Sequence, residues 1–259
     1  MILESKAALE FIPKRIISLV PSQTELLHYL GLEQETIGIT KFCVHPNAWY
    51  TSKTRVGGTK NIKKEIIDKL NPDLIIANKE ENVKEQIEEL AAQYPVWLTD
   101  VNNFEDALQM IEDIGALTGK LTEAKRLTAT IKISFLELEE PQTSNLKPQT
   151  AYLIWRNPYM SVGGDTFINS MLNKCGLTNI FAQESRYPEL TIAQLQTANC
   201  KLLLLSSEPY PFAQKHIDEL KEQLPGTKIM LVDGEIFSWY GSRLLYAADY
   251  FNKLRTSLL

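Results

Sequence analysis

The sequence predicts an α/β protein of two Rossmann-like lobes, joined by one long backbone helix, with a ligand cleft between the lobes. Short apolar, β-branched runs alternate with helical stretches in the first half of the chain. The second half repeats this plan, and an amphipathic stretch separates the two halves. Strands that alternate with helices form βαβ units and parallel sheets. We therefore expect two similar parallel sheets rather than one.

The N-terminal lobe is assigned to residues 14–118. Its first strand is the β-branched run Arg15–Val20. Ser22 and Glu25 have the spacing of a capping box, which predicts a helix from this point to Leu30. The remaining expected elements are a helix carrying Ile62, Ile66 and Leu70, a strand at 73–77, a helix at 83–92 and a strand at 96–98.

Residues 119–145 are assigned to the connecting helix and a linker. Apolar side chains recur at helical spacing within Leu121–Glu139, namely Ala124, Leu127, Ile131, Phe135 and Leu138. One face of this helix is therefore apolar and the other charged. At about 1.5 Å per residue the helix is about 28 Å long, and Pro141 begins the break that follows it.

The C-terminal lobe is assigned to residues 146–259. Strands are expected at 151–155, 201–205 and 228–232, and a helix at 167–174. Asp165 or Thr166 is expected to cap that helix. The glycine turns at Gly57-Gly58 and Gly163-Gly164 do not match the phosphate-binding pattern G-x-x-x-x-G-K-[ST], so no nucleotide site is inferred.

Composition excludes several classes of protein. The net charge is −5, with a pI near 5.4, whereas a nucleic-acid-binding protein normally carries a basic face. Hydrophobic residues make up 44% of the chain, which suits a globular core and argues against disorder. No apolar run reaches the ~18 residues of a membrane span. Three scattered cysteines do not form a disulfide framework.

Two motifs carry a family resemblance. The run Arg15-Ile-Ile-Ser-Leu-Val-Pro-Ser-Gln-Thr-Glu-Leu26 and the run Leu70-Asn-Pro-Asp-Leu-Ile-Ile76, in this layout, resemble the helical-backbone metal receptor family. These are class III substrate-binding proteins of ABC importers for cobalamin, haem and ferric siderophores. The resemblance implies a monomeric, non-catalytic receptor without an obligatory cofactor. It also implies a metal chelate as ligand and an ABC permease as partner.

The chain departs from the cobalamin-binding members of that family at several positions. Thr59 and Asn78 stand where those members place tryptophans over the corrin. Glu65 matches the first of two glutamates that dock on the permease, but Ala193, followed by Gln194, replaces the second. Glu189 lies nearby in sequence without being the aligned position.

The run Phe237-Ser-Trp239-Tyr240-Gly-Ser-Arg243 is the strongest candidate for ligand binding. It follows a predicted strand, and ligands of α/β sheets bind at the carboxyl ends of strands. Three aromatic side chains within four residues are not expected all to face a core, so at least one should be exposed or line the cleft. The alternative is that Phe237 and Tyr240 pack beneath the loop while Arg243 caps a neighbouring element.

Further candidates follow other strands. Trp155 is equally suited to a core or to a ligand wall, whereas Arg156 and Tyr159 lie beyond the strand end and fit a cleft better. Lys79 belongs either to a solvated helix start or to the ligand site, and Glu208 lies in another strand-end loop. Arg156, Arg243 and Lys79 would meet ligand carboxylates.

Cys43 and His45 form the one candidate metal pair. Their C-x-H spacing places both side chains on one side of an extended chain, where they could bind zinc, cobalt or haem iron, with Glu208 approaching from the other lobe. The favoured alternative is a buried thiol beside a hydrogen-bonded imidazole. No catalytic residue is assigned.

The sequence thus predicts a substrate-binding protein of an ABC importer for a metal chelate. The alternative is a cytoplasmic protein or enzyme of the same fold that handles a metal or a corrinoid. The resemblance implies a periplasmic location. No signal peptide is visible after Met1, so a cytoplasmic location is expected if Met1 is the native start.

Overall fold

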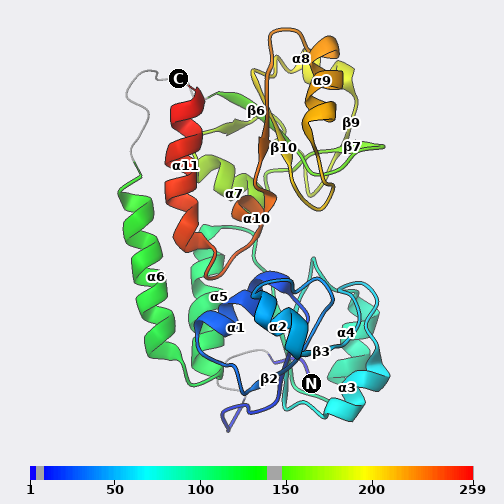
Figure 1. The fold of residues 1–259 in the computed structure, drawn as a ribbon, viewed down its shortest axis with the longest axis vertical. Helices are drawn as coiled ribbons and strands as arrows, with labels where there is room; N and C mark the ends of the chain where they lie inside the picture. Colours follow the sequence, from blue (N-terminus) through cyan, green and yellow to red (C-terminus); the bar gives the residue numbers. More distant parts are fainter. Residues whose placement is uncertain (4–8, 139–147, 259) are drawn as a thin grey trace. The chain divides into compact units, whose positions relative to one another are not determined.

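The computed structural model describes residues 1–3, 9–138 and 148–258, which fold into two compact units (Figure 1). Unit 1 takes residues from Met1–Val101, Glu105–Lys132 and Tyr240–Leu245. Unit 2 takes residues from Asn102–Phe104, Ile133–Trp239 and Tyr246–Leu259. The units are therefore discontinuous in sequence, whereas the ranges assigned from the sequence are consecutive.

Unit 1 contains a parallel sheet whose strands lie in the order β3-β2-β1-β4-β5. Their bounds are β1 Ile16–Ser18, β2 Thr36–Ile39, β3 Thr54–Arg55, β4 Leu74–Asn78 and β5 Val96–Thr99. Every residue of β1 and β4 is buried. Such apolar runs are typical of central parallel strands that helices cover on both faces. The N-terminal residues continue the sheet, because Leu3 donates its backbone N–H to the Val96 carbonyl at 2.9 Å.

The helices of unit 1 alternate with these strands, as the sequence predicts. Their bounds are α1 Pro21–Tyr29, α2 Asn47–Ser52, α3 Lys64–Leu70, α4 Lys84–Ala91 and α5 Phe104–Leu117, with the first part of α6 Leu121–Leu136. The capping box predicted for α1 is wrong. The helix begins one residue earlier with Pro21 at its first position, and its N-cap Val20 has no side-chain cap bond. Glu25 is therefore available for another partner.

Unit 2 contains a second parallel sheet with the strand order β11-β10-β6-β8, and an antiparallel pair β7-β9. The strands are β6 Gln149–Leu153, β7 Tyr159–Met160, β8 Thr178–Asn179, β9 Glu189–Leu190, β10 Leu202–Ser206 and β11 Lys228–Val232. Its helices are α7 Phe167–Lys174, α8 Ile192–Thr197, α9 Gln214–Gln223, α10 Gly234–Ser238 and α11 Leu244–Leu258. Two separate parallel sheets confirm the predicted fold class.

The predicted connecting helix exists and ends earlier than expected. α6 carries the chain from unit 1 into unit 2, but it stops at Leu136, and residue 139 lies outside the described residues. Within unit 1, α5 and α6 approach closely where both residues are small. A Cβ added to Gly115 would lie 2.4 Å from the Ala124 Cβ. α11 also starts in unit 1 and continues in unit 2, a feature that the sequence analysis did not anticipate.

None of the described helices is both long and apolar enough to pass through a membrane.

Candidate functional site

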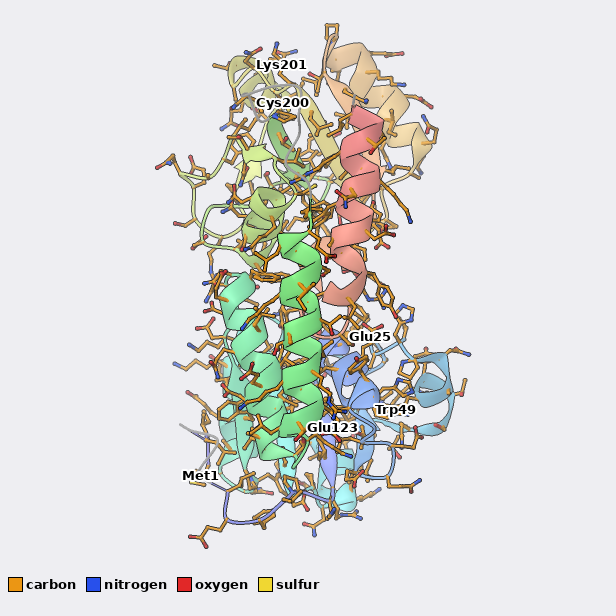
Figure 2. The ribbon with its side chains drawn as sticks, turned by 90° about the vertical axis from the view of Figure 1, so that its left-hand side faces the viewer. Met1, Glu25, Trp49, Glu123, Cys200 and Lys201 are labelled. Atoms are coloured by element: carbon orange, nitrogen blue, oxygen red, sulfur yellow. The ribbon has the colours of Figure 1, made fainter. Side chains whose placement is uncertain are left out.

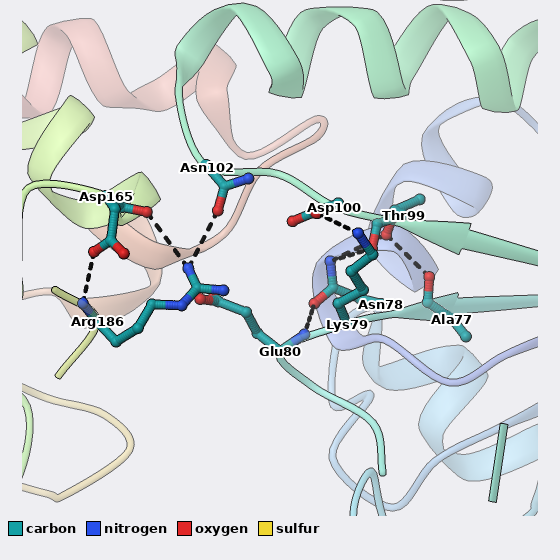
Figure 3. A network of polar contacts seen from close by, with 9 residues as sticks. All are labelled: Ala77, Asn78, Lys79, Glu80, Thr99, Asp100, Asn102, Asp165 and Arg186. Atoms are coloured by element: carbon teal, nitrogen blue, oxygen red, sulfur yellow. Dashed lines mark hydrogen bonds and ion pairs between the residues drawn. The ribbon is translucent and has the colours of Figure 1, made fainter. Parts of the chain in front are cut away.

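Buried polar side chains gather at the carboxyl ends of the unit 1 strands. Thr99, at the end of β5, accepts hydrogen bonds from the amide groups of Gln23 at 2.6 Å and Asn78 at 3.1 Å. Its hydroxyl donates to the Ala77 carbonyl at 3.0 Å (Figure 3). The Asn82 amide donates to the Thr59 carbonyl at 3.1 Å. Thr59 and Asn78 are both buried, so they are part of the internal packing at this edge of the sheet.

Lys79 is paired with a neighbouring strand end. Its ammonium lies 2.6 Å from the Asp100 carboxylate, which follows β5 (Figure 3). Both groups are substantially exposed, so this ion pair adds little stability. It nevertheless places a negative charge beside the cation that the sequence assigned to a ligand carboxylate. Glu80, the next residue, accepts a bond from the Lys60 ammonium through its backbone carbonyl.

Glu81 is a candidate that the sequence analysis did not single out. Its backbone N–H donates to the Asn78 side chain at 3.2 Å, and its carboxylate is half-buried. Among the described residues, this carboxylate has no hydrogen-bond or ion-pair partner. Burial raises the pKa of the Glu81 carboxyl, nearby Lys60 opposes that rise, and Glu80 adds to it. Two acids after a strand end were visible in the sequence, but the sequence could not show which of Glu80 and Glu81 is the more buried.

Cys43 behaves as a structural thiol. It is fully buried, and its sulfur lies 3.1 Å from the Thr24 hydroxyl and 3.2 Å from the Thr40 hydroxyl. Burial raises the pKa of the thiol despite these bonds, which disfavours the thiolate that binds metals. Within the described residues, no group of three His, Cys, Asp or Glu side chains could hold a metal ion. Cys43 therefore matches the favoured alternative of a buried thiol, and metal binding by Cys43 and His45 stays a prediction.

Arg243 has an internal partner in unit 1. Its guanidinium donates to Glu25 through Nε at 3.0 Å and through Nη2 at 2.8 Å, and both side chains are largely buried. Glu25 lies on α1 (Figure 2). Gly241 allows the segment that carries Arg243 to lie close to α1, because a Cβ at this position would lie 3.3 Å from the Ser22 carbonyl oxygen. This ion pair matches the alternative prediction for Arg243, in which the side chain bonds to a neighbouring element.

No aromatic side chain of the run 237–240 is exposed, so this part of the expectation is wrong, and the lining of a cleft stays a prediction. Phe237, Trp239 and Tyr240 are all buried, with 0%, 7% and 7% of their surface exposed. Phe237 packs in unit 2 against Tyr152 and Phe251, with ring centroids 5.2 and 5.0 Å apart. The chain passes from unit 2 to unit 1 between residues 239 and 240, a passage that no residue pattern in this run indicates.

Trp155 is an exposed aromatic side chain of unit 2, as is Tyr246 on α11. It follows β6 with 41% of its surface exposed. Its ring meets the Tyr210 ring edge-on at 5.7 Å, and Tyr210 in turn contacts Phe212 at 4.7 Å. Tyr159 is half-buried and packs against the core of this unit. Trp155 is thus a supported, outward aromatic ring at a strand end, which suits a ligand wall better than a core position.

A buried histidine, His216, lies next to Tyr210. His216 is 3% exposed, and its Nδ1 accepts a bond from the Ala213 backbone N–H at 2.8 Å, at the start of α9. Its Nε2 lies 3.4 Å from the Tyr210 hydroxyl. Burial lowers the pKa of His216, as do the positive charges of Arg156 and Lys215. The neutral form of the imidazole is therefore favoured, and it packs against Tyr210.

Arg156 and Glu208 also have partners within unit 2. The Arg156 guanidinium lies 2.6 Å from the Glu219 carboxylate on α9. Glu208 accepts a bond from the Ser238 hydroxyl at 2.7 Å. It lines a cavity of about 650 Å³ at the ends of β10 and β11, together with Ser207, Leu231, Val232, Asp233 and Glu235. This cavity is polar and acidic.

The Gly163-Gly164 segment brings two backbone segments together. A Cβ on Gly163 would lie 2.4 Å from the Glu184 carbonyl oxygen, and one on Gly164 would lie 2.1 Å from the Ala182 oxygen. The adjacent Asp165 accepts the Arg186 backbone N–H at 2.6 Å, and the Arg186 guanidinium contacts Asn102 at 3.2 Å (Figure 3). Of the two caps considered for α7, Thr166 is confirmed.

The positions considered for permease docking lie at helix starts. Glu65 is exposed in the first turn of α3. Ala193 is exposed in the first turn of α8, and the adjacent Gln194 accepts bonds from Thr191 in a capping box. Glu189 is exposed on β9.

The family of periplasmic binding proteins matches this chain over residues 16–228. The chain belongs to that family. The resemblance stated from the two motifs is thereby confirmed.

Curated relatives agree with this membership. The vitamin B12-binding protein of Vibrio parahaemolyticus is 25% identical over 195 residues, which cover 74% of this chain and 70% of that protein. The ABC transporter substrate-binding lipoprotein YvrC of Bacillus subtilis is 27% identical over 188 residues. That alignment covers 69% of this chain and 59% of YvrC, so the chain matches less than two thirds of this relative.

Solved structures share the fold. The heme-binding protein RhuT of Roseiflexus superposes with a TM-score of 0.79 at 19% identity, covering 94% of this chain and 97% of that one. The vitamin B12-binding protein BtuF of Vibrio cholerae gives a TM-score of 0.79 at 19% identity, covering 94% and 98%.

Proposed function

We propose that this chain is the substrate-binding component of an ABC importer, and that it binds a metal chelate without transforming it. Family membership supports this proposal, and so do the relatives, which include vitamin B12-binding and heme-binding proteins and an ABC transporter lipoprotein. In keeping with them, we propose a location outside the cytoplasmic membrane and docking on a permease through the exposed Glu65.

The observation that carries the ligand class is Trp155. It is a large aromatic side chain, partly exposed at the carboxyl end of a parallel strand, and the Tyr210 ring fixes its orientation. Binding sites in α/β proteins lie at such strand ends. A flat apolar macrocycle or a chelate with an aromatic shell would cover this ring and remove it from water, which is favourable at about 25 cal/mol per Å².

A binding panel tests the proposal. Purified protein is titrated with cyanocobalamin, cobinamide, haemin and ferric siderophores by calorimetry. We expect saturable one-to-one binding of at least one class, with a Kd between about 1 nM and 1 µM. Trp155→Ala should weaken that binding by about tenfold or more, and Trp155→Phe by less. Absence of saturable binding across the panel would contradict the proposal.

A further inference from the structure

A row of ring contacts within unit 2 links a buried histidine to the exposed Trp155 ring. The Trp155 ring meets the Tyr210 ring edge-on, with 5.7 Å between their centroids. The Tyr210 ring in turn meets the His216 imidazole edge-on at 5.5 Å. Phe212 contacts Tyr210 and His216, with ring centroids 4.7 and 5.4 Å away. A change at His216 can therefore reach Trp155 through one intervening ring.

The backbone that carries the Trp155 ring is held independently of His216. The Met160 N–H donates to the Trp155 carbonyl at 3.2 Å, and the Ile154 N–H donates to the Met160 carbonyl at 3.0 Å. The Tyr210 N–H donates to the Ile154 carbonyl at 3.3 Å. A movement of the Tyr210 side chain would therefore change the orientation of the Trp155 ring and leave the backbone in place.

The hydrogen bonds of His216 define its neutral form. Nδ1 accepts the Ala213 backbone N–H at 2.8 Å, so this nitrogen carries no proton and Nε2 carries the ring proton. Nε2 lies 3.4 Å from the Tyr210 hydroxyl. Protonation would place a second N–H at Nδ1, where it would face the Ala213 N–H. Two donors would then meet, and the bond that holds the imidazole in place would be lost.

The charged and titratable groups that face His216 come from three segments. Arg156 follows β6 and Lys215 lies on α9, and both oppose a positive imidazole. Glu219 on α9 favours it, but this carboxylate already lies 2.6 Å from the Arg156 guanidinium. Tyr210, from the loop after β10, presents a hydroxyl. Because His216 is also buried, a charged imidazole would be poorly solvated here, and we expect it to leave this position.

We propose that His216 is a positioning residue for Trp155, and that protonation of its imidazole releases the Tyr210 and Trp155 rings, so that the chain holds its ligand less tightly in acid. Loss of ligand in acid requires Trp155 to be the ligand wall, so this part rests on the proposed function. Release of the rings occurs in the free protein and needs no ligand.

NMR of the free, isotope-labelled protein tests the release of the rings. The indole N–H signal of Trp155, assigned with Trp155→Phe, is followed from about pH 8 to about pH 5 together with the imidazole signals of His216. We expect the Trp155 signal to follow the protonation of His216. His216→Gln keeps an acceptor for the Ala213 N–H and should remove this pH dependence. A Trp155 signal that ignores the protonation of His216 overturns the inference, and so does a His216 that stays neutral until the protein unfolds.

Two further variants locate the effect. Tyr210→Leu removes the intervening ring, so the Trp155 signal should no longer follow His216, and coupling that persists would contradict the route through Tyr210. His28→Gln is the matched control. His28 is exposed on α1 of unit 1, where its ring meets the Trp49 ring edge-on at 5.2 Å. This variant removes an imidazole beside a different tryptophan and should leave the pH dependence of the Trp155 signal unchanged.

Binding measurements test the consequence for the ligand. The Kd of cyanocobalamin, cobinamide, haemin and ferric siderophores is measured at about pH 7.5 and about pH 5.5 in the wild type and in His216→Gln. For the probe that binds, we expect the Kd of the wild type to rise about threefold or more in acid relative to that of the variant. Equal changes in the two proteins overturn the loss of ligand in acid but leave the proposed function standing. Absence of binding by every probe contradicts the proposed function, whereas the NMR titration still decides the release of the rings.

Discussion

Arg243 and Glu25 form a two-point ion pair although 218 positions separate them in the sequence. The pair fastens the segment Tyr240–Leu245 to helix α1 within unit 1. It therefore joins the start of the last long helix to the first helix of the chain. The arginine that the sequence assigns to a ligand is thus paired with Glu25, and its role in ligand binding stays a prediction.

Removing one member of this pair should destabilise the fold. Glu25→Gln leaves a largely buried guanidinium without its counter-charge, and we expect a loss of about 2 kcal/mol in the free energy of unfolding. Urea unfolding of Glu25→Gln, Arg243→Met and the double variant gives the coupling energy, expected at about 1–3 kcal/mol. Lys253→Met, in an exposed pair, is the control. A coupling energy near zero would show that the pair does not hold the segment.

The close backbone approach at Gly164 predicts intolerance to a methyl group. A Cβ would lie 2.1 Å from the Ala182 oxygen, so Gly164→Ala should shift the loop and lower the free energy of unfolding by more than about 2 kcal/mol. At Gly58 the nearest atoms belong to the Phe42 and Lys41 side chains, which can move. Gly58→Ala should therefore cost much less. Equal losses in the two variants would refute this account of the loop.

His216 predicts a specific pH dependence of stability. Its pKa is lowered in the folded state from an ordinary value of 6.5, since burial and Arg156 disfavour the charged form. The neutral imidazole thus stabilises the fold fully above pH 6.5, and this contribution is lost as the pH falls through the lowered pKa. His216→Gln keeps an acceptor for the Ala213 N–H but does not titrate. Relative to that variant, the wild type should lose stability as the pH falls below 6.5. If the stability of the wild type and of His216→Gln changes with pH in parallel, the lowered pKa of His216 is contradicted.

The three cysteines should be unreactive in the folded protein. Cys43, Cys175 and Cys200 are all buried, and burial raises the pKa of each thiol, that of Cys175 to about 12. Alkylation by iodoacetamide should proceed only after unfolding, when all three thiols become accessible. Zinc should not protect Cys43, because it is bonded to Thr24 and Thr40. Rapid labelling of Cys43 in native protein, or its protection by zinc, would revive the metal hypothesis.

The fold was predictable because its signals are local. The runs that form β4 and β10 are apolar except at their last residues, and α7 has the bounds that its spacing predicts. The family motifs lie in β1, α1 and β4, where backbone geometry depends on neighbouring residues. The end of the connecting helix was misplaced by a few residues, as the apolar spacing continues past Leu136.

The site was harder to predict because its decisive contacts are remote in sequence. Arg156 and Glu219 are 63 positions apart, and Lys79 and Asp100 are 21 apart. No spacing rule links such pairs, so the sequence did not indicate that each cation is already paired with a carboxylate of the chain. The burial of Phe237 depends on Tyr152 and Phe251, which are also remote from it in the sequence or separated by a turn. Among the aromatic candidates for ligand binding, only Trp155, which the polar residues Arg156 and Asn157 follow, is exposed.

Tryptophan fluorescence during chelate titration tests the central claim most directly. The chain has four tryptophans, and Trp97→Phe serves as the matched control for Trp155→Phe. We expect one chelate of the panel to quench the fluorescence of the wild type and of Trp97→Phe saturably, at one ligand per chain. The quench should be largely lost in Trp155→Phe. Quenching that persists in Trp155→Phe would contradict a Trp155 ligand wall, and no saturable quench by any chelate would contradict the receptor function itself.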